Sequence, residues 1–362
     1  MKRLVLVLAI AVLVLPGAAV GAACSPLNCA PSQFTLAHGT LLGFRESIDK
    51  PLRVIDLNTG TTRWRLPAGI VTGDTLVHQD GSLITWFDAA HGTRIGDAVL
   101  QLHGAFSLVG TSQNGSRAVL ARTQTRSTTF AIVSRDSSRL VKLGGSQWSF
   151  DALRGTKLFL IKTLNYGYQV RLYDLATNTL VQRALKDPGE SATISGSPFA
   201  RVSSPDGRYL FTLYLGGGGG GAMIHELDLV AGTARCIDLP GDGNFAAATT
   251  WALVTDPDGR TLWALSPGYG RVVAVDVPGH RIRRTWTFNP GIWTSNAGAA
   301  VLSPDGSHFA LTDAQHVWFI VLEPKLAVRR SVHVALALAW SPDQRHLWAI
   351  GERSRVSSLP LR

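Results

Sequence analysis

One short motif occurs four times in the second half of the chain. The stretch Ser-Pro-Asp-Gly-Arg-Tyr-Leu at residues 204–210 is followed by three variants: DPDGRTL at 256–262, SPDGSHF at 303–309 and SPDQRHL at 341–347. Proline presets a negative φ and glycine tolerates a positive one, so each copy predicts a tight turn between two strands. Small apolar residues precede three of these turns, at 246–254, 297–302 and 335–340. Aromatic and aliphatic residues follow the turns, so short strands at regular intervals predict an all-β fold.

A second turn motif marks the other half of each unit. The segment VIDLNTG at residues 54–60 has counterparts in LYDLATN at 172–178, LDLVAG at 227–232 and VDVPG at 275–279. Two hairpins per unit give four antiparallel strands, which is one blade of a β-propeller.

The number of blades follows from counting the first hairpins. We place them near Gly39, Gly73, Gly115, Gly155, Gly207, Gly259, Gly306 and Gln344. This count favours eight blades, with seven as the alternative because the first three turns have the weakest signals. The last unit, residues 334–361, has room for only three strands, so closing the ring requires either a strand from the N-terminal segment or a short final blade.

The two turn motifs together resemble the bacterial extracytoplasmic repeats called YVTN or WD40-like. The stretch GDTLVHQDGSLITWFDAAHG at residues 73–92 is instead similar to the quinoprotein-type repeat. The resemblance covers most of residues 33–362 and implies a β-propeller, but it implies no particular site. Quinoprotein dehydrogenases often stack their cofactor on a disulfide between adjacent cysteines, and this chain has no adjacent cysteines.

The N-terminus has the layout of a secretory signal peptide. Lys2 and Arg3 precede twelve apolar residues at 4–15, and Pro16 is followed by small residues up to Ala23. We therefore divide the chain into a signal peptide at 1–23, a linker at 24–32 and a single propeller domain at 33–362. The predicted location is extracytoplasmic: secreted, periplasmic or attached to the cell envelope. Three forms remain open, namely a cleaved soluble protein, a lipoprotein modified at Cys24 and an uncleaved anchor.

The three cysteines leave two disulfide arrangements open. If Cys24 carries a lipid, Cys29 and Cys236 form an even pair. If it does not, Cys24 and Cys29 can close a short loop. No C-x-x-C pair is present, so nothing in the spacing of the cysteines indicates a zinc site.

Composition narrows the class of function. Hydrophobic residues make up 45% of the chain and charged residues 17%, which argues against disorder. The net charge is +10, with its densest groups at Arg281, Arg283 and Arg284 and at Arg329 and Arg330. We predict that both groups lie on outer strands, where charge prevents edge-to-edge aggregation; the alternative is an anion-binding stripe. An exported protein is not expected to bind nucleic acid.

Ligands of propellers usually bind at the mouth formed by the loops that lead into the inner strands and by the second-to-third loops. These loops carry our candidate ligand residues: Asp187, Glu190, Asp242, Asn244, Asn296, Trp293, His103 and His333. Calcium binds six to eight oxygens, so Asp187, Glu190, Asp242 and Asn296 are the candidates for such a cation. Six glycines at residues 216–221 predict a mobile hairpin tip and not a phosphate loop, because a strand follows them.

These observations favour an exported, monomeric binding or scaffolding module whose partner is a protein or another ligand of the cell envelope. The module needs no cofactor, and only a lipid at Cys24 would bring it to a membrane. The alternative is an enzyme of the lactonase or lyase kind with a divalent cation at the mouth. No G-x-S-x-G or H-E-x-x-H motif supports hydrolase or zinc chemistry.

Overall fold

The computed structural model describes residues 32–187, 189, 191–216, 221–289, 299–312, 315–351 and 355–359. Within these ranges the chain forms eight antiparallel sheets, each built from consecutive strands. Seven sheets have four strands and the last has three, and together they are the eight blades of a β-propeller. The preference for eight blades over seven is therefore confirmed.

The first four blades occupy residues 32–180. Their strands are β1 (Ser32–Leu36), β2 (Leu41–Arg45), β3 (Leu52–Asp56) and β4 (Thr61–Leu66); β5 (Ile70–Thr72), β6 (Thr75–Asp80), β7 (Leu83–Asp88) and β8 (Thr93–Val99); β9 (Ser107–Thr111), β10 (Ala118–Gln124), β11 (Ser127–Val133) and β12 (Ser138–Gly144); and β13 (Trp148–Arg154), β14 (Lys157–Thr163), β15 (Tyr168–Asp174) and β16 (Thr179–Leu180). A 3-10 turn, η1 (Ala37–Gly39), joins β1 to β2.

The last four blades occupy residues 197–359. Their strands are β17 (Ser197–Ser203), β18 (Tyr209–Leu215), β19 (Ala222–Asp228) and β20 (Thr233–Asp238); β21 (Ala252–Thr255), β22 (Thr261–Ser266), β23 (Arg271–Asp276) and β24 (Arg281–Thr287); β25 (Ala300–Leu302), β26 (His308–Thr312), β27 (His316–Val321) and β28 (Ala327–Val332); and β29 (Ala337–Trp340), β30 (Leu347–Ile350) and β31 (Val356–Leu359). One short helix, α2 (Phe245–Ala248), lies before β21.

All eight predicted first hairpins are present, because each proposed glycine or Gln344 lies between the first two strands of a blade. Gly207, Gly259 and Gly306 have positive φ angles of 63°, 70° and 74°, as the turn motif requires. Gln344, which replaces the glycine in the last copy, has a φ of 58°. The turns therefore have the predicted geometry.

The strand expected at residues 246–254 is wrong at its start. Residues 245–248 are the helix α2, and the strand β21 begins only at Ala252. Asn244 caps the helix by accepting a hydrogen bond from the Ala247 amide through its side chain, at 3.3 Å. Alanine is the best helix former, so a capped run of alanines favours a helical turn over an extended strand.

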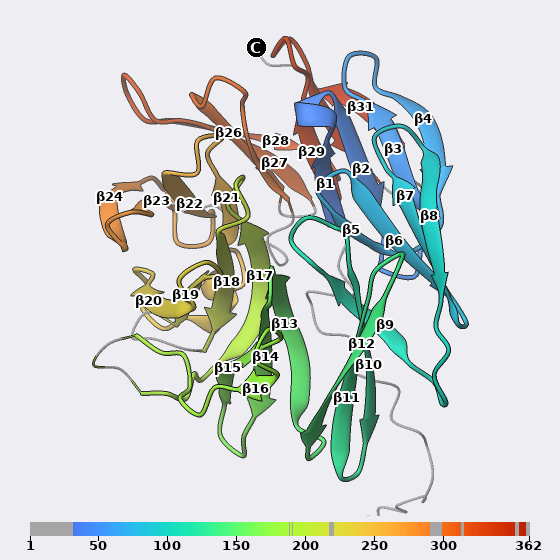
Figure 1. Cartoon of the computed structure of the whole chain (residues 1–362). Coiled ribbons are helices and arrows are strands. Elements are labelled where there is room, and N and C mark those ends of the chain that lie inside the picture. Colours follow the sequence, from blue (N-terminus) through green and yellow to red (C-terminus); the bar gives the residue numbers. More distant parts are fainter. Residues whose placement is uncertain are drawn as a thin grey trace, which may run out of the picture.

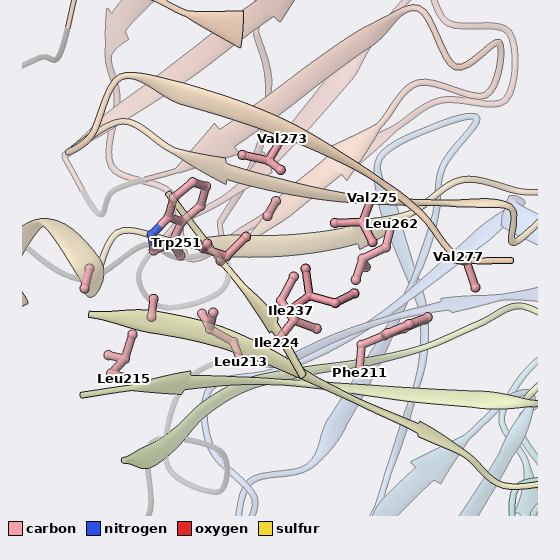
Figure 2. Packing of buried hydrophobic residues seen from close by; sticks show 14 residues of the cluster. Phe211, Leu213, Leu215, Ile224, Ile237, Trp251, Leu262, Val273, Val275 and Val277 are labelled. Atoms are coloured by element: carbon pink, nitrogen blue, oxygen red, sulfur yellow. The ribbon is translucent and has the colours of Figure 1, made fainter. Parts of the chain in front are cut away.

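Apolar side chains hold neighbouring blades together. Figure 2 shows the packing between blades 5 and 6, where Phe211, Leu213 and Ile224 meet Leu262 and Val275. All five side chains are fully buried. Each fully buried side chain of this size stabilises the fold by about 1.5–3 kcal/mol relative to exposure, so these wedge interfaces are the core of the protein.

The ring closes by contact between the first and last blades, which lie side by side in Figure 1, blue beside red. The Leu338 amide of β29 donates to Gln33 Oε1 of β1 at 3.0 Å, and the Trp348 indole donates to the Leu57 carbonyl at 2.7 Å. A shared apolar cluster includes Phe44 from blade 1 and Ile350 from blade 8. Among the described residues the last blade thus stays three-stranded, which is one of the two closures that the sequence left open.

Residues 1–31 lie outside the described ranges. They include the predicted signal peptide and all of the predicted linker except Ser32, which begins β1, so Cys24 and Cys29 cannot be placed. Residues 360–362 lie outside the described ranges as well. No helix within those ranges is both long and apolar enough to cross a membrane.

Candidate functional site

The two ends of the ring carry different connections. Because the strands of a blade alternate in direction, the first-to-second and third-to-fourth turns lie at one end, which we call the turn face. The second-to-third loops and the segments that lead from one blade into the next lie at the other end, the mouth. Both repeated sequence motifs belong to the turn face. The mouth is therefore the end at which the loops vary.

At the mouth, the segment between blades 5 and 6 folds into an ordered platform. The Asn244 amide donates to Asp242 Oδ1 at 3.0 Å, and Asn244 then caps α2. Asp242 and Asn244 are both exposed, as is the first residue of the helix, Phe245, at 60%. The chain thus presents a carboxylate, an amide and an aromatic ring side by side.

Tyr269, from the loop between β22 and β23, completes this surface. Its hydroxyl donates to the Asn244 carbonyl at 2.9 Å, and its ring lies 5.9 Å from that of Trp251. The Arg271 guanidinium lies over the Tyr269 ring, 5.9 Å from its centroid. Burial first, and then the nearby charge of Asp242, raise the pKa of Tyr269 above its usual value. Tyr269 is therefore a neutral hydrogen-bond donor at ordinary pH. We call Asp242, Asn244, Phe245 and Tyr269 the mouth platform.

Buried hydroxyl groups fix the mouth platform from below. Thr250 and Ser266 are both fully buried, and their side-chain oxygens lie 2.6 Å apart. Thr250 donates to the Ala247 carbonyl and accepts from the Gly268 amide, while Ser266 accepts from the Tyr269 amide. A Cβ added at Gly268 would lie 2.6 Å from Thr250 Oγ1, so only glycine fits there. The helix and the Tyr269 loop are thus locked to each other.

The glycine-rich hairpin lies next to this platform. The Gly216 amide donates to the Gly221 carbonyl at 2.9 Å, which closes the β18–β19 hairpin as predicted. A Cβ added at Gly221 would lie 3.3 Å from the Gly243 Cα, so the base of the hairpin lies against the Asp242 loop. Residues 217–220, and with them the predicted mobility of the tip, lie outside the described ranges.

The remaining candidates are distributed over other parts of the ring. Asp187 forms an ion pair with Arg235 at 3.1 Å and accepts from the Cys236 amide at 3.1 Å, so its carboxylate lies on the outer strand β20. His103 is exposed in the segment between blades 2 and 3. His333 lies between blades 7 and 8, with Nε2 at 3.2 Å from Ser357 Oγ. Of the predicted ligand residues, the structure thus brings together Asp242 and Asn244.

Three of the candidates cannot be placed. Glu190, Trp293 and Asn296 lie outside the described ranges. Within those ranges no group of three or more His, Cys, Asp or Glu side chains is arranged to hold a metal ion.

A buried polar row between blades 4 and 5 had no sequence signal. Arg201 of β17 forms an ion pair with Asp151 of β13 at 2.6 Å and donates to Thr212 Oγ1 at 3.2 Å. Asp151 occupies a β-bulge, which turns its side chain towards the next blade. His225 pairs in register with Thr212 and is 3% exposed, and burial lowers its pKa to about 4. The row lies within an otherwise apolar interface, so it fixes how the two blades meet.

A hollow on the turn face differs in character from the mouth platform. It lies between blades 1 and 2, has a volume of about 370 Å³ and is lined by Asp56, Arg63, Trp64 and His91 among others. The Asp56 carboxylate binds Arg63 and the Asn58 amide of its own turn. The carboxylate of Asp56 is thus bound within its own turn, whereas the side chain of Asp242 at the mouth is exposed.

Sequence reasoning missed Phe245, Thr250 and Ser266. It assigned residues 246–254 to a strand and so did not expect an exposed ring at the head of a helix. The available signal was Asn244 directly before Phe-Ala-Ala-Ala, because asparagine is a preferred helix cap. The two hydroxyls had no signal, since their partners are 16 and 18 residues away along the chain.

The sequence matches no protein-family model and no curated protein. Many solved structures are similar in fold, and three of them are compared with this chain below. AztD from Citrobacter koseri has a TM-score of 0.52 and 13% identity, over 83% of this chain and 86% of that one. The Dos1 propeller has a TM-score of 0.52 and 8% identity, over 92% and 94%. The dihydro-heme d1 dehydrogenase NirN, in complex with DHE, has a TM-score of 0.51 and 12% identity, over 92% and 78%. At these identities the likeness extends to the fold alone: the chain is an eight-bladed β-propeller.

Proposed function

We propose that the protein is a binding module of the cell envelope and that its ligand contacts the mouth platform. The observation that carries the proposal is the exposed ring of Phe245 beside the partly buried ring of Tyr269, on a base locked by buried hydroxyl groups. Rigid, exposed aromatic side chains lose little conformational entropy on binding and dominate the energetics of many interfaces. The signal-like N-terminus supports a location outside the cytoplasm.

The chemistry of the platform suits a partner with an apolar or ring-bearing group beside a hydrogen-bond donor. Phe245 offers a stacking face, and Asp242 offers a carboxylate that can accept from the same ligand. An envelope protein or glycan has both kinds of group. In this proposal the ligand is held by contacts and not transformed.

Crosslinking from the mouth tests this proposal. A photo-reactive residue at position 245 should capture a defined partner in the cell envelope, and Tyr269→Ala should lower that capture at least tenfold, the loss expected for an interface hot spot. Tyr166 provides the matched control, because it is an aromatic residue that is 89% exposed in the second-to-third loop of blade 4. Tyr166→Ala should leave capture unchanged. Equal losses in both variants, with unchanged melting temperatures, would contradict the proposal.

The lactonase- or lyase-like alternative predicts a bound divalent cation. Metal analysis of the purified full chain, with thermal melting in the presence and absence of a chelator, distinguishes it from a binding module. A stoichiometric divalent cation, and a melting temperature that drops on chelation and in Asp242→Asn, would support the enzyme and overturn the binding module.

A further inference from the structure

A row of polar side chains crosses blade 5 from its inner strand to its outer strand. In the register of the sheet, Arg201 of β17 lies opposite Thr212 of β18, which lies opposite His225 of β19. His225 in turn lies opposite Cys236 of β20. Side chains of directly opposite residues project from the same face of a sheet. Cys236 packs against an apolar cluster that includes Tyr168 of blade 4, so this face is the one that meets blade 4.

The two halves of this row differ in how their polar atoms are satisfied. In the inner half, the Arg201 guanidinium binds the Asp151 carboxylate at 2.6 Å and donates to Thr212 Oγ1 at 3.2 Å. In the outer half, His225 is 3% exposed, and its Nε2 has no hydrogen-bond partner among the residues that the structure describes. Burying a polar atom without a partner is costly. The unpartnered imidazole nitrogen therefore points to a bound ligand.

Two sulfur-bearing side chains lie beside His225. Cys236 is directly opposite on the neighbouring strand, so the Cβ atoms of the two residues are about 4.5–5.5 Å apart. Met223 is two residues before His225 on β19, so it projects from the same face, and it is 6% exposed. Apart from Met1, it is the only methionine in the sequence. We call His225, Cys236 and Met223 the soft-donor group.

Aromatic rings cover the soft-donor group on the side of blade 4. Tyr214 lies opposite Met223 in the register, and its ring lies edge-on to the His225 ring with centroids 6.2 Å apart. Tyr168 stacks on Tyr214 with centroids 5.2 Å apart. Burial lowers the pKa of His225 to about 4, so its imidazole is neutral at pH 7, which is the form that binds a metal ion. Cys236 lies on the outermost strand and is only half-buried, so an ion can enter from that side.

We propose that the soft-donor group binds a copper(I) ion between blades 4 and 5. Thiolate and thioether sulfurs are soft ligands that select copper(I), and a neutral imidazole binds copper as well. Zinc(II) sites are instead built from cysteine, histidine and carboxylate ligands, without a thioether. On binding, the Cys236 thiol releases its proton to solvent and its sulfur forms the bond to copper. The copper remains in the +1 state, so no electron is transferred.

The charges around the soft-donor group favour a monovalent ion. One thiolate cancels the charge of copper(I), whereas zinc(II) would leave a positive charge in the buried interface, on the same row as Arg201. Asp151 already pairs with Arg201, and Asp187 pairs with Arg235, so neither carboxylate is available to balance a divalent ion. This site goes beyond the proposed binding function and does not depend on the mouth platform. It is also separate from the divalent cation that the enzyme alternative predicts at the mouth.

Titration of the purified full chain with copper(I), without oxygen and against a competing copper(I) chelator, tests the proposal. Cys24 and Cys29 are thiols that can bind copper(I) as well, so the variant C24S/C29S is the reference. This variant should still bind one copper(I) ion. The ion should also raise its melting temperature, because a ligand that binds only the folded state stabilises that state.

Further substitutions in this reference variant remove the proposed ligands one at a time. Cys236→Ser should weaken copper(I) binding at least about 100-fold, since even the partners of metal ligands contribute about 10–100-fold. Met223→Leu conserves the side-chain volume, so the protein should fold normally and bind copper(I) about tenfold more weakly. His225→Gln should weaken binding at least about tenfold. His103→Gln, at an exposed position, is its control and should change the affinity less than about twofold.

Three results would overturn the proposal. The first is a C24S/C29S variant that binds no copper(I). The second is an affinity that Met223→Leu leaves unchanged, or that His225→Gln and His103→Gln lower equally, while the melting temperatures of the metal-free proteins stay the same. The third is zinc(II) binding as tight as copper(I) binding, because the thioether and the single thiolate should both disfavour zinc.

Discussion

The connections between adjacent strands are stabilised differently at the turn face and at the mouth. At the turn face, Ser204, Ser303 and Ser341 each donate to the aspartate two residues later, at 2.5–2.6 Å. Each of these serines also accepts from the amide five residues later, at 2.9–3.0 Å. At the mouth of blades 5 and 6, the connections are a capped helix and a glycine hairpin, and two buried hydroxyl groups stabilise them.

This difference indicates that the turn face maintains the fold, whereas the mouth is suited to bind a ligand. The polar groups of the turns bind one another within six residues, so they can be repeated in any blade and few remain for a ligand. The mouth loops are supported by distant residues, and so their exposed tips are free to vary. The predictions below test how far the two faces, and the wedge interface between them, depend on these different supports.

The largest effect is expected where the turn face closes the ring. Gly60 has a φ of 69°, and a Cβ added there would lie 2.6 Å from the Trp348 ring of blade 8. Gly60→Ala combines a strained backbone with a clash, so it should lower the free energy of unfolding by about 3–4 kcal/mol. Gly81→Ala has a similar φ of 56° but open space around it, and should cost about 1 kcal/mol. Urea unfolding measures both, and equal costs would show that the Trp348 contact is not a closing contact.

The wedge interface between blades 4 and 5 should make stability depend on pH. Burial lowers the pKa of His225 to about 4, whereas an unfolded histidine titrates near 6.5. Between these values the unfolded chain binds the proton and the folded chain does not, so stability falls as the pH drops from about 6.5 to 4. The loss attributable to His225 is about 3 kcal/mol.

His225→Gln should remove this part of the pH dependence. Unfolding free energies measured from pH 7 to 4 should show a shallower slope in the variant than in the wild type. His103→Gln, at an exposed position in the segment between blades 2 and 3, is the control and should keep the wild-type slope. An unchanged slope in His225→Gln would mean that the imidazole titrates in the folded protein as it does in water.

At the mouth, the hydroxyl group of Thr250 should contribute more to stability than the volume of its side chain. Thr250→Val keeps the volume but leaves the Gly268 amide and the hydroxyl hydrogen of Ser266 without an acceptor in a fully buried place. The expected cost is about 2 kcal/mol, together with a change in the near-ultraviolet circular dichroism from the Trp251–Tyr269 contact. Thr250→Ser retains the hydroxyl and should keep that spectrum. A wild-type spectrum in Thr250→Val would show that the mouth platform does not depend on this network.

The fold could be predicted from the sequence because the turns of the turn face are formed by local sequence motifs. Proline, aspartate and glycine at fixed spacing act through neighbours a few residues away, so the first hairpins of the last four blades could be located from their own residues. The first hairpins of the earlier blades were marked only by glycines and had weaker signals. The mouth platform depends on contacts between Asn244 and Tyr269 and between Thr250 and Ser266, which join separate loops. The polar row of Arg201, Thr212 and His225 becomes visible only once the register of β17, β18 and β19 is known. Such long-range pairings leave no periodic trace in one sequence.

The smallest effect is expected in a single repeated turn, that of blade 7. Hydrogen bonds from Ser303 and Ser307 lower the pKa of Asp305 to about 2, below the usual value near 3.9 of an unfolded aspartate. The ionised carboxylate therefore contributes stability above pH 4, and this contribution is lost as the pH falls through about 2. Asp305→Ala should lower the free energy of unfolding by about 1 kcal/mol at pH 7, and the difference from the wild type should vanish near pH 2. Asp136→Ala, in the exposed turn between β11 and β12, is the control and should change stability by less than about 0.5 kcal/mol. If the stability difference between Asp305→Ala and the wild type persists at pH 2, Asp305 supports the turn through its shape and not through its charge. The turn face would then depend on packing, as the mouth does.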